Sequence, residues 1–356
     1  MFTKKMLPIA VALAMGIGVA GEASATVYAG SRLLIESLVI DVNDANGLDV
    51  PPVNPGFVFT ATNTANYDGD IRIEDEQCSG TPLSNNCGIP PAAALDPAAA
   101  QVGTAQPENT FTYLGPGALE YARSDSVIDA AQLVGGVPSA TRQIAETEIQ
   151  DGSEFARANA EIQSTTTLTY TFTVLTDFPY TLDLIMSADP DLLAFIDETL
   201  SDPQAIVPTT AQTNVNFTFG LSNEDTGDTV AWTPNGFVTA AGCTVDGDGI
   251  DDLTCVEILD DEDLSRTVGA SSLPASGNDF SRYNPDVFPP DNPDLGFSDF
   301  QIRVGNILEG TYTLTLNAVT STNVVRTVPE PASILLLGSG LAALGVGLRR
   351  KRKGKA

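Results

Sequence analysis

The residues best suited to chemistry lie in the stretch Cys243–Cys255, CTVDGDGIDDLTC, where four aspartates alternate with glycines and small residues. The carboxylates belong to Asp246, Asp248, Asp251 and Asp252. Calcium takes about six to eight oxygen ligands, and glycine lets the chain curl around the ion. The spacing therefore predicts a calcium-binding loop held by these four aspartates. A solvated acidic turn closed by a disulfide is the alternative, and the sequence leaves both open.

This loop resembles the calcium repeats of thrombospondin type-3 and dockerin-like proteins through Asp246-Gly-Asp248-Gly249-Ile250-x-Asp252. The match is incomplete, because Thr244 stands where a first Asp is usual and Cys255 stands where a bidentate Glu is usual. Downstream acids could supply the missing ligand: Glu257, Asp260, Asp261, Glu262 and Asp263. Taken alone, the acidic run 260–263 predicts a solvated surface turn.

The chain has no histidine, which removes Ser-His-Asp and Cys-His catalysis as well as His-ligated zinc. Paired carboxylates can hydrolyse glycosides at the right separation, but nothing in the sequence selects one pair among the many acids. No P-loop, dinucleotide-binding or G-x-S-x-G motif occurs. The sequence thus favours a non-enzymatic protein, with a carboxylate-dependent polysaccharide hydrolase as the alternative. Trp232 and Tyr283 could stack on sugars, but we expect them in the core.

The elements that must position these residues read as strands, because Thr, Val, Phe and Tyr alternate between turn-forming Gly, Pro, Asn and Asp. In the clearest strand, Thr165–Leu175, apolar residues fall on one face and threonines on the other. Other strands are expected at Tyr180–Met186, Leu33–Val42, Gly56–Thr60, Ile71–Glu74, Thr110–Leu114, Val215–Leu221, Thr229–Thr233, Phe300–Val304 and, after a turn at Leu308–Gly310, from Tyr312 onward. The pattern predicts an all-β domain, a β-sandwich or jelly-roll with long loops.

Three segments depart from this alternation. Asp191–Leu200 predicts a short helix, with Asp189 as its N-cap and Pro190 as its first residue. Ile89–Gln106 and Ser271–Phe297 lack periodicity and are expected to be long surface loops.

One pattern occurs twice, as YARSDSVI at Tyr121–Ile128 and as FARANAEI at Phe155–Ile162. If both are strands, each places its aromatic residue, its arginine and its Asp or Asn on one face. Two interpretations stay open. The segments are two similar strands of one sheet whose arginines pair with acids, or they form a polar face that receives a sugar.

The N-terminal 25 residues have the features of a secretory signal peptide. Lys4 and Lys5 precede an apolar run from about residue 7 to 20, and small residues follow. Ala23 and Ala25 occupy the positions that a signal peptidase requires, so we expect cleavage between Ala25 and Thr26.

The other end carries an uncharged segment, Ala332–Leu348, near the lower length limit for crossing a bilayer. Six positive charges follow between Arg349 and Lys355, which by the positive-inside rule places the tail in the cytoplasm and the body outside. The tetrapeptide Val328-Pro329-Glu330-Pro331 stands just before this segment.

Together these three parts, residues 328–356, resemble the PEP-CTERM sorting signal of Gram-negative bacteria. The resemblance implies that an exosortase, a membrane cysteine peptidase-transpeptidase, recognises the tail and removes it. It also implies an exported protein, transiently anchored in the inner membrane, that reaches the cell surface or extracellular matrix and associates with exopolysaccharide or biofilm.

The body between the two signals, residues 26–327, is strongly acidic. All five lysines lie in the terminal segments, and nine arginines against 44 acids leave the body a formal charge of −35. Phosphate binding needs clustered Lys and Arg, so nucleic acid is excluded as a partner. A body of this charge attracts cations and repels its own copies.

The four cysteines form two close pairs, Cys78/Cys87 and Cys243/Cys255. An even count in an exported chain favours disulfides, and we expect each pair to bond locally. A four-thiolate metal site is the alternative, although the two spacings fit zinc poorly.

These observations predict a signal peptide at 1–25, a β-rich extracytoplasmic domain at 26–327 and a sorting signal with one membrane helix at 328–356. The favoured function is a non-enzymatic matrix protein that uses calcium and exopolysaccharide. A calcium-stabilised structural module without any further ligand is a second alternative.

Overall fold

The computed structural model describes residues 25–44, 46–48, 53–81, 84–85, 98–108, 110–117, 120–129, 139–150, 157–175, 178–198, 209–239, 243–247, 249, 252–271, 279–283 and 296–327. The signal peptide before Ala25, the sorting tetrapeptide and the expected membrane helix lie outside these residues. Within the described part of the chain, no helix is long and apolar enough to span a bilayer.

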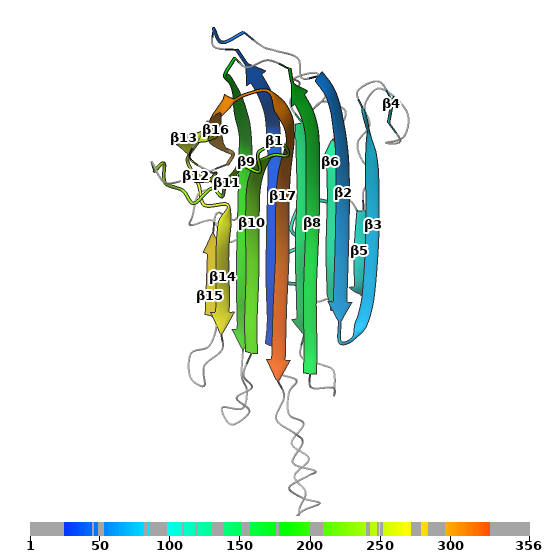
Figure 1. Ribbon diagram of the computed structural model, residues 1–356. Coiled ribbons are helices and arrows are strands. Elements are labelled where there is room, and N and C mark those ends of the chain that lie inside the picture. Colours follow the sequence, from blue (N-terminus) through cyan, green and yellow to red (C-terminus); the bar gives the residue numbers. More distant parts are fainter. Residues whose placement is uncertain are drawn as a thin grey trace, which may run out of the picture.

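Two antiparallel sheets lie face to face, as Figure 1 shows. Among the described residues, one sheet has eight strands in the order β13-β16-β9-β1-β7-β6-β5, with β15 also paired to β9. The other has nine strands in the order β12-β11-β10-β17-β8-β2-β3-β4, with β14 also paired to β10. The expectation of an all-β chain is thus confirmed, with two antiparallel sheets.

The eight-stranded sheet contains β1 (Ala25–Asn43), β5 (Ala98–Gly103), β6 (Tyr121–Asp129), β7 (Ser139–Gln150), β9 (Tyr180–Glu198), β13 (Thr254–Asp260), β15 (Asp279–Tyr283) and β16 (Ser298–Ile307). The nine-stranded sheet contains β2 (Val53–Tyr67), β3 (Asp70–Thr81), β4 (Ser84–Asn85), β8 (Arg157–Val174), β10 (Thr209–Asn223), β11 (Thr229–Trp232), β12 (Cys243–Asp246), β14 (Ser265–Ser271) and β17 (Gly310–Thr327).

The alternation of apolar residues and threonines fixes which face of the nine-stranded sheet is buried. Along β17, Tyr312, Leu314 and Leu316 point inward, and their partners across the ladder are apolar residues of β8. The rings of Phe172 and Tyr312 stack with centroids 5.4 Å apart. Burying each such side chain contributes about 1.5–3 kcal/mol, so a one-residue slip in register would be strongly unfavourable.

Polar groups also join the two sheets across the core. Ser31 on β1 donates to the carbonyl of Asn214 on β10 at 2.7 Å, and Thr213 donates to the carbonyl of Gly30 at 2.9 Å. Asn63 on β2 donates to Ser126 on β6 at 2.6 Å. Each bond satisfies a polar group that would be costly to bury alone, and it fixes how the sheets are aligned.

The expected strands are confirmed with one exception. Thr110–Leu114 is not a strand; it lies in an irregular segment across the outer face of the eight-stranded sheet. The two expected loops are wrong in part, since each contains a strand, β5 in the first and β15 in the second. Both strands are short and lie at sheet edges, where a strong apolar pattern is not required.

The expected helix at Asp191–Leu200 is wrong, because the chain continues as β9 through Glu198. β9 pairs with β1 along its length, and side chains on both of its faces are buried. A strand buried on both faces reads as a continuous apolar run, which periodicity cannot distinguish from a helix. Pro190 lies between the part of β9 that pairs with β16 and the part that pairs with β15. Proline has no backbone N–H, and at this position neither β15 nor β16 requires a hydrogen bond from it.

A disulfide joins Cys243 on β12 to Cys255 on β13, with Cα atoms 5.9 Å apart. β12 lies at the edge of the nine-stranded sheet and β13 at the edge of the eight-stranded sheet. The predicted pairing is therefore present, and it links the two sheets across their open side. Cys78 is also disulfide-bonded, whereas its expected partner Cys87 lies outside the described residues.

Candidate functional site

The repeated pattern seen in the sequence places a buried arginine, Arg123, on the outer face of the eight-stranded sheet. Its guanidinium contacts Glu146 at 2.8 Å and Asp125 at 3.5 Å, and only 1% of the side chain is exposed. It also donates to the carbonyls of Pro107 and Thr112, at 3.2 and 2.8 Å. The first copy of the pattern therefore forms a buried ion pair, as one of the two interpretations predicts, and its arginine does not reach solvent.

The expectation that both copies belong to one sheet is wrong. Tyr121–Asp129 forms β6 in the eight-stranded sheet, whereas β8, which begins at Arg157, belongs to the nine-stranded sheet. The shared pattern sets the alternation of side chains along each strand but carries no information about pairing partners. The side chains of residues 157–164 lie outside the described part of the chain.

A second buried arginine lies on the same face. Arg32 on β1 contacts Asp189 at 3.2 Å and forms a closer ion pair with Asp191, both on β9. All three side chains are at most 5% exposed. Removing one partner of such a pair leaves an uncompensated buried charge. The two clusters together are called the ionic layer below, and they consist of Arg32, Asp189, Asp191, Arg123, Asp125 and Glu146.

An irregular segment, the described residues of 107–117, covers these charges and is called the covering segment below. The amides of Leu114 and Gly115 donate to Glu146 at 2.8 and 3.0 Å, and Tyr113 donates to the carbonyl of Asp191 at 2.6 Å. Gly30 lies beneath Tyr113, where an added Cβ would come within 2.7 Å of the ring. The ionic layer is thus closed over by the chain itself and has no room for a ligand.

The acidic loop predicted to bind calcium is described only in part, since Asp248 and Asp251 lie outside the described residues. Both carboxylate oxygens of Asp252 accept from the amide of Gly249, at 2.8 and 2.9 Å. A Cβ added at Gly247 would lie 2.6 Å from Asp252 Oδ1 and 3.0 Å from Asp228 Oδ1, so both carboxylates approach this glycine closely. Asp246 is exposed on β12.

The described residues alone contain no group of three or more His, Cys, Asp or Glu side chains arranged to hold a metal. Asp228 is a carboxylate that the sequence interpretation missed, because it precedes the loop by many residues and comes near it only through the pairing of β11 with β12. Asp228 and Asp252 supply oxygen donors of the type that calcium prefers.

The acidic run that follows the loop is not a solvated turn throughout, which corrects that expectation. Asp260 and Glu262 are buried, at 3% and 4% exposure, while Asp261 is exposed. Asp260 accepts from the amides of Asn235 and Gly236 at 2.8 and 3.2 Å. Burial raises the pKa of Asp260, and the two amide donors oppose that rise.

Glu257 is likewise directed into the protein. It accepts from Trp232 Nε1 at 2.6 Å and from the amide of Thr239 at 2.8 Å. Trp232 is 1% exposed, which confirms its place in the core. The half-buried Tyr283 accepts from the amide of Asp263 at 3.1 Å. These carboxylates hold the segment between β11 and β12 in place.

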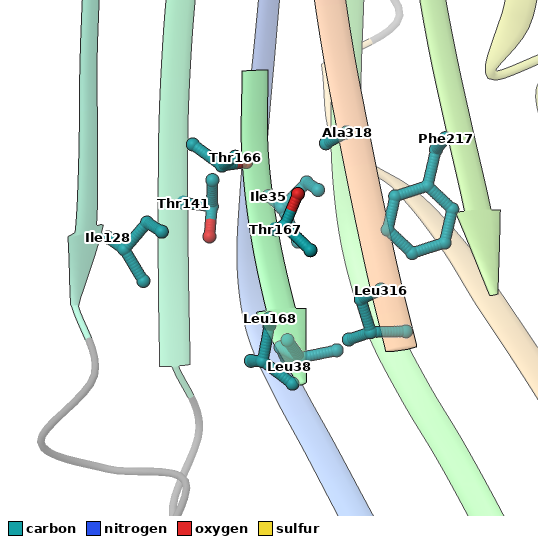
Figure 2. Close-up of a pocket in the computed structure, with 10 residues that line it drawn as sticks. All are labelled: Ile35, Leu38, Ile128, Thr141, Thr166, Thr167, Leu168, Phe217, Leu316 and Ala318. Carbon is teal, nitrogen blue, oxygen red and sulfur yellow. The ribbon is translucent and has the colours of Figure 1, made fainter. Parts of the chain in front are cut away.

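A small cavity lies between the sheets, as Figure 2 shows. It measures about 20 Å³, room for a single water molecule. Ile35, Leu38 and Ile128 come from one sheet, and Leu168, Phe217, Leu316 and others come from the facing sheet. A cavity of this size takes no substrate, so the core has a structural role.

The ionic layer predicts very different costs for two arginine substitutions in the eight-stranded sheet. Arg123→Met leaves Glu146 and Asp125 buried without their cation, and should lower the free energy of unfolding by about 3–5 kcal/mol. Arg142→Met is the matched control, because Arg142 and Glu36 form an exposed pair at 3.4 Å. That change should cost about 0–1 kcal/mol. Urea unfolding measures both, and equal losses would contradict a buried ionic layer.

Because many tyrosines are buried, we expect the protein to unfold at alkaline pH in a single step. Burial raises the pKa of seven phenols, to about 12 for Tyr170 and Tyr283. The other five are Tyr28, Tyr67, Tyr113, Tyr121 and Tyr312. In the unfolded chain these phenols ionise near pH 10, so stability is fully present below that pH and is lost as the pH rises above it.

We therefore expect absorbance at 295 nm and the circular dichroism of the sheets to change together above about pH 10. Tyr170→Phe removes one raised phenol and should shift the midpoint to higher pH. Phenols that ionise separately while the circular dichroism stays constant would refute the argument.

The similarity to known proteins lies at the C-terminal end of the chain. The family model described as the PEP-CTERM protein-sorting motif matches residues 327–352. No curated protein and no solved structure matches the chain. The matched range contains the tetrapeptide Val328–Pro331, the apolar segment after it and the first basic residues, in the order that the sequence interpretation recognised. The chain therefore carries a PEP-CTERM protein-sorting motif immediately after β17, and this motif implies export and recognition by an exosortase.

Proposed function

We propose that the protein is exported, anchored briefly in the inner membrane, processed by an exosortase and delivered to the cell surface or extracellular matrix, where it associates with exopolysaccharide. The observation that carries this proposal is the sorting motif at residues 327–352. The signal peptide expected at residues 1–25 provides the route across the membrane. The six positive charges at the end hold the tail on the cytoplasmic side until processing.

The role in the matrix is non-enzymatic in this proposal. Three carboxylates that could have formed a hydrolytic pair are buried: Glu257, Asp260 and Glu262. The oxygens of Glu257 and Asp260 accept hydrogen bonds from amides and from the Trp232 indole. A general acid or base must reach the substrate oxygen, and carboxylates held in this way support packing instead.

Calcium is proposed as the stabilising ion of the acidic loop. Asp246, Asp248, Asp251 and Asp252 remain the proposed ligands, and the approach of Asp228 to Gly247 adds a fifth carboxylate. A site in which these oxygens surround one ion would stabilise the acidic loop. It would also offset part of the repulsion within a strongly acidic body.

The sorting proposal predicts a defect from one substitution. Glu330→Ala removes the carboxylate of the tetrapeptide, and the chain should keep its tail and accumulate in the inner membrane. Cell fractionation with mass spectrometry of the C-terminus measures both effects. The matched control is Glu309→Ala, at the exposed turn before β17, which should be processed normally. Normal processing of the Glu330 variant would count against recognition of this tetrapeptide.

The matrix proposal predicts calcium-dependent binding. The mature protein, purified from its producing cells, should co-sediment with the exopolysaccharide of those cells in calcium and lose that binding in EDTA. Asp252→Asn should raise the calcium concentration needed by about tenfold. Asp68→Asn is the control, because Asp68 and Gly69 form a positive-φ hairpin turn in which Asn fits equally well.

The outcomes separate the alternatives. Binding that survives EDTA would keep the polysaccharide role and remove calcium from it. A rise in melting temperature with calcium but no binding would favour a calcium-stabilised structural module. Release of soluble sugars would favour a hydrolase.

A further inference from the structure

The outer face of the nine-stranded sheet is uncharged over its middle. Every second residue of a strand points outward, and the registers align these residues in rows across β2, β8, β17 and β10. One row reads Thr60, Thr167, Asn317 and Thr218. On β10, β14 and β17, and on β2 after Val58 and β8 after Thr165, the outward residues with described side chains are all uncharged. They are Thr, Ser, Asn, Gln, Gly or Val.

This neutrality contrasts with a body of formal charge −35. Toward the two sides of the sheet, the outward acids begin with Asp75 on β3 and Asp246 on β12. Long strands lie side by side between them, as the front of Figure 1 shows. A partner approaching this face meets hydroxyl and amide groups, although the body as a whole carries a strong negative charge.

The face contains a hollow of about 250 Å³ where β10 lies between β14 and β17. The described residues that line it are 212–214 of β10, Thr267 of β14 and 321–323 of β17. All of them are Gln, Asn, Thr or Ser. The hollow is smaller than the sites that take drug-sized molecules, and its size suits one polar unit of a larger polymer.

Two observations indicate that the hollow is built to accept hydrogen-bonding groups. The Asn214 amide donates to Thr267 Oγ1 at 2.8 Å and to the Arg266 carbonyl at 3.2 Å, which fixes its carbonyl oxygen as an acceptor. Asn323 Oδ1 is buried and accepts no hydrogen bond from the described residues. A desolvated acceptor without a donor is unfavourable, and a ligand hydroxyl would supply that donor.

The lining excludes most classes of ligand. Its described residues offer no Lys or Arg for phosphate, sulfate or carboxylate groups, and no carboxylate for a cation or an amine. It has no aromatic or large aliphatic side chain for an apolar group. What remains is an uncharged molecule rich in hydroxyl groups.

We propose that this hollow, with Gln212, Asn214, Thr267, Ser321 and Asn323 as its contacts, binds one sugar unit of a neutral polysaccharide that lies along the uncharged face. The proposal rests on the proposed association with exopolysaccharide and specifies both the class of polymer and the surface that binds it. An acidic exopolysaccharide is not the partner, because the surrounding negative charge repels it and the hollow has no cation to compensate.

The test uses exopolysaccharide from the producing cells, separated by anion exchange into neutral and acidic fractions. The mature protein should be retarded in native gels that contain the neutral fraction and should run unchanged in gels with the acidic fraction. Asn323→Ala and Gln212→Ala should each weaken the dissociation constant by about tenfold. Asn317→Ala is the matched control, with the same residue type, strand and face but outside the hollow. Thermal unfolding should show that all variants are folded.

Each result decides a different point. Equal retardation of Asn323→Ala, Asn317→Ala and the unmodified protein would place binding outside the hollow and overturn this inference, while leaving the matrix function standing. Binding of the acidic fraction alone would overturn the neutral class of ligand in the same way. Binding of neither fraction would remove the polysaccharide function and this inference together.

Discussion

The carboxylate of Glu146 is the group on which the outer side of the eight-stranded sheet depends. It accepts from Tyr28 of β1 at 2.5 Å, from Arg123 of β6, and from two amides of the covering segment. A fully buried carboxylate is tolerated only when its oxygens are paired and hydrogen-bonded, and here donors from three parts of the chain meet that need. The covering segment is held in position by the same requirement. The eight-stranded sheet is therefore packed against the other sheet on one face and sealed by the covering segment on the other.

The two sheets differ in how many of their faces are buried. The eight-stranded sheet is buried on both faces around β1 and β9. Its buried arginines form ion pairs with carboxylates of the same sheet. The nine-stranded sheet is buried on one face only, and its outward threonines and amides are half-exposed. The nine-stranded sheet thus exposes the face proposed to bind a partner, and the eight-stranded sheet packs against its buried face. Side chains that are already ordered lose less entropy on binding.

The sequence correctly predicted the strands that have one buried face and one solvent-exposed face. β8 and β17 are apolar on one face and polar on the other, so alternation alone identifies them. Alternation gave the wrong prediction for β9, because burial on both faces hides the two-residue period of a strand. It was also wrong for Thr110–Leu114, whose apolar residues cover the outer face of a sheet and do not form a strand. Local spacing identified the Cys243–Cys255 bond, and the Asp68-Gly69 hairpin carries an equally local signal. The hollow could not have been found in this way, because its residues meet only through the pairing of β10, β14 and β17.

The position of β17 has a mechanical consequence. This strand ends at Thr327, directly before the sorting motif, and it runs between β8 and β10 with ladder partners on both sides along most of its length. In the proposed membrane-anchored state, a pull on the body would be transmitted along the axis of β17. Such a load shears the two ladders, so that many hydrogen bonds must break at once, whereas a terminal strand at the sheet edge would peel away one bond at a time. The sorting motif thus follows a strand that ladders hold in the nine-stranded sheet from both sides.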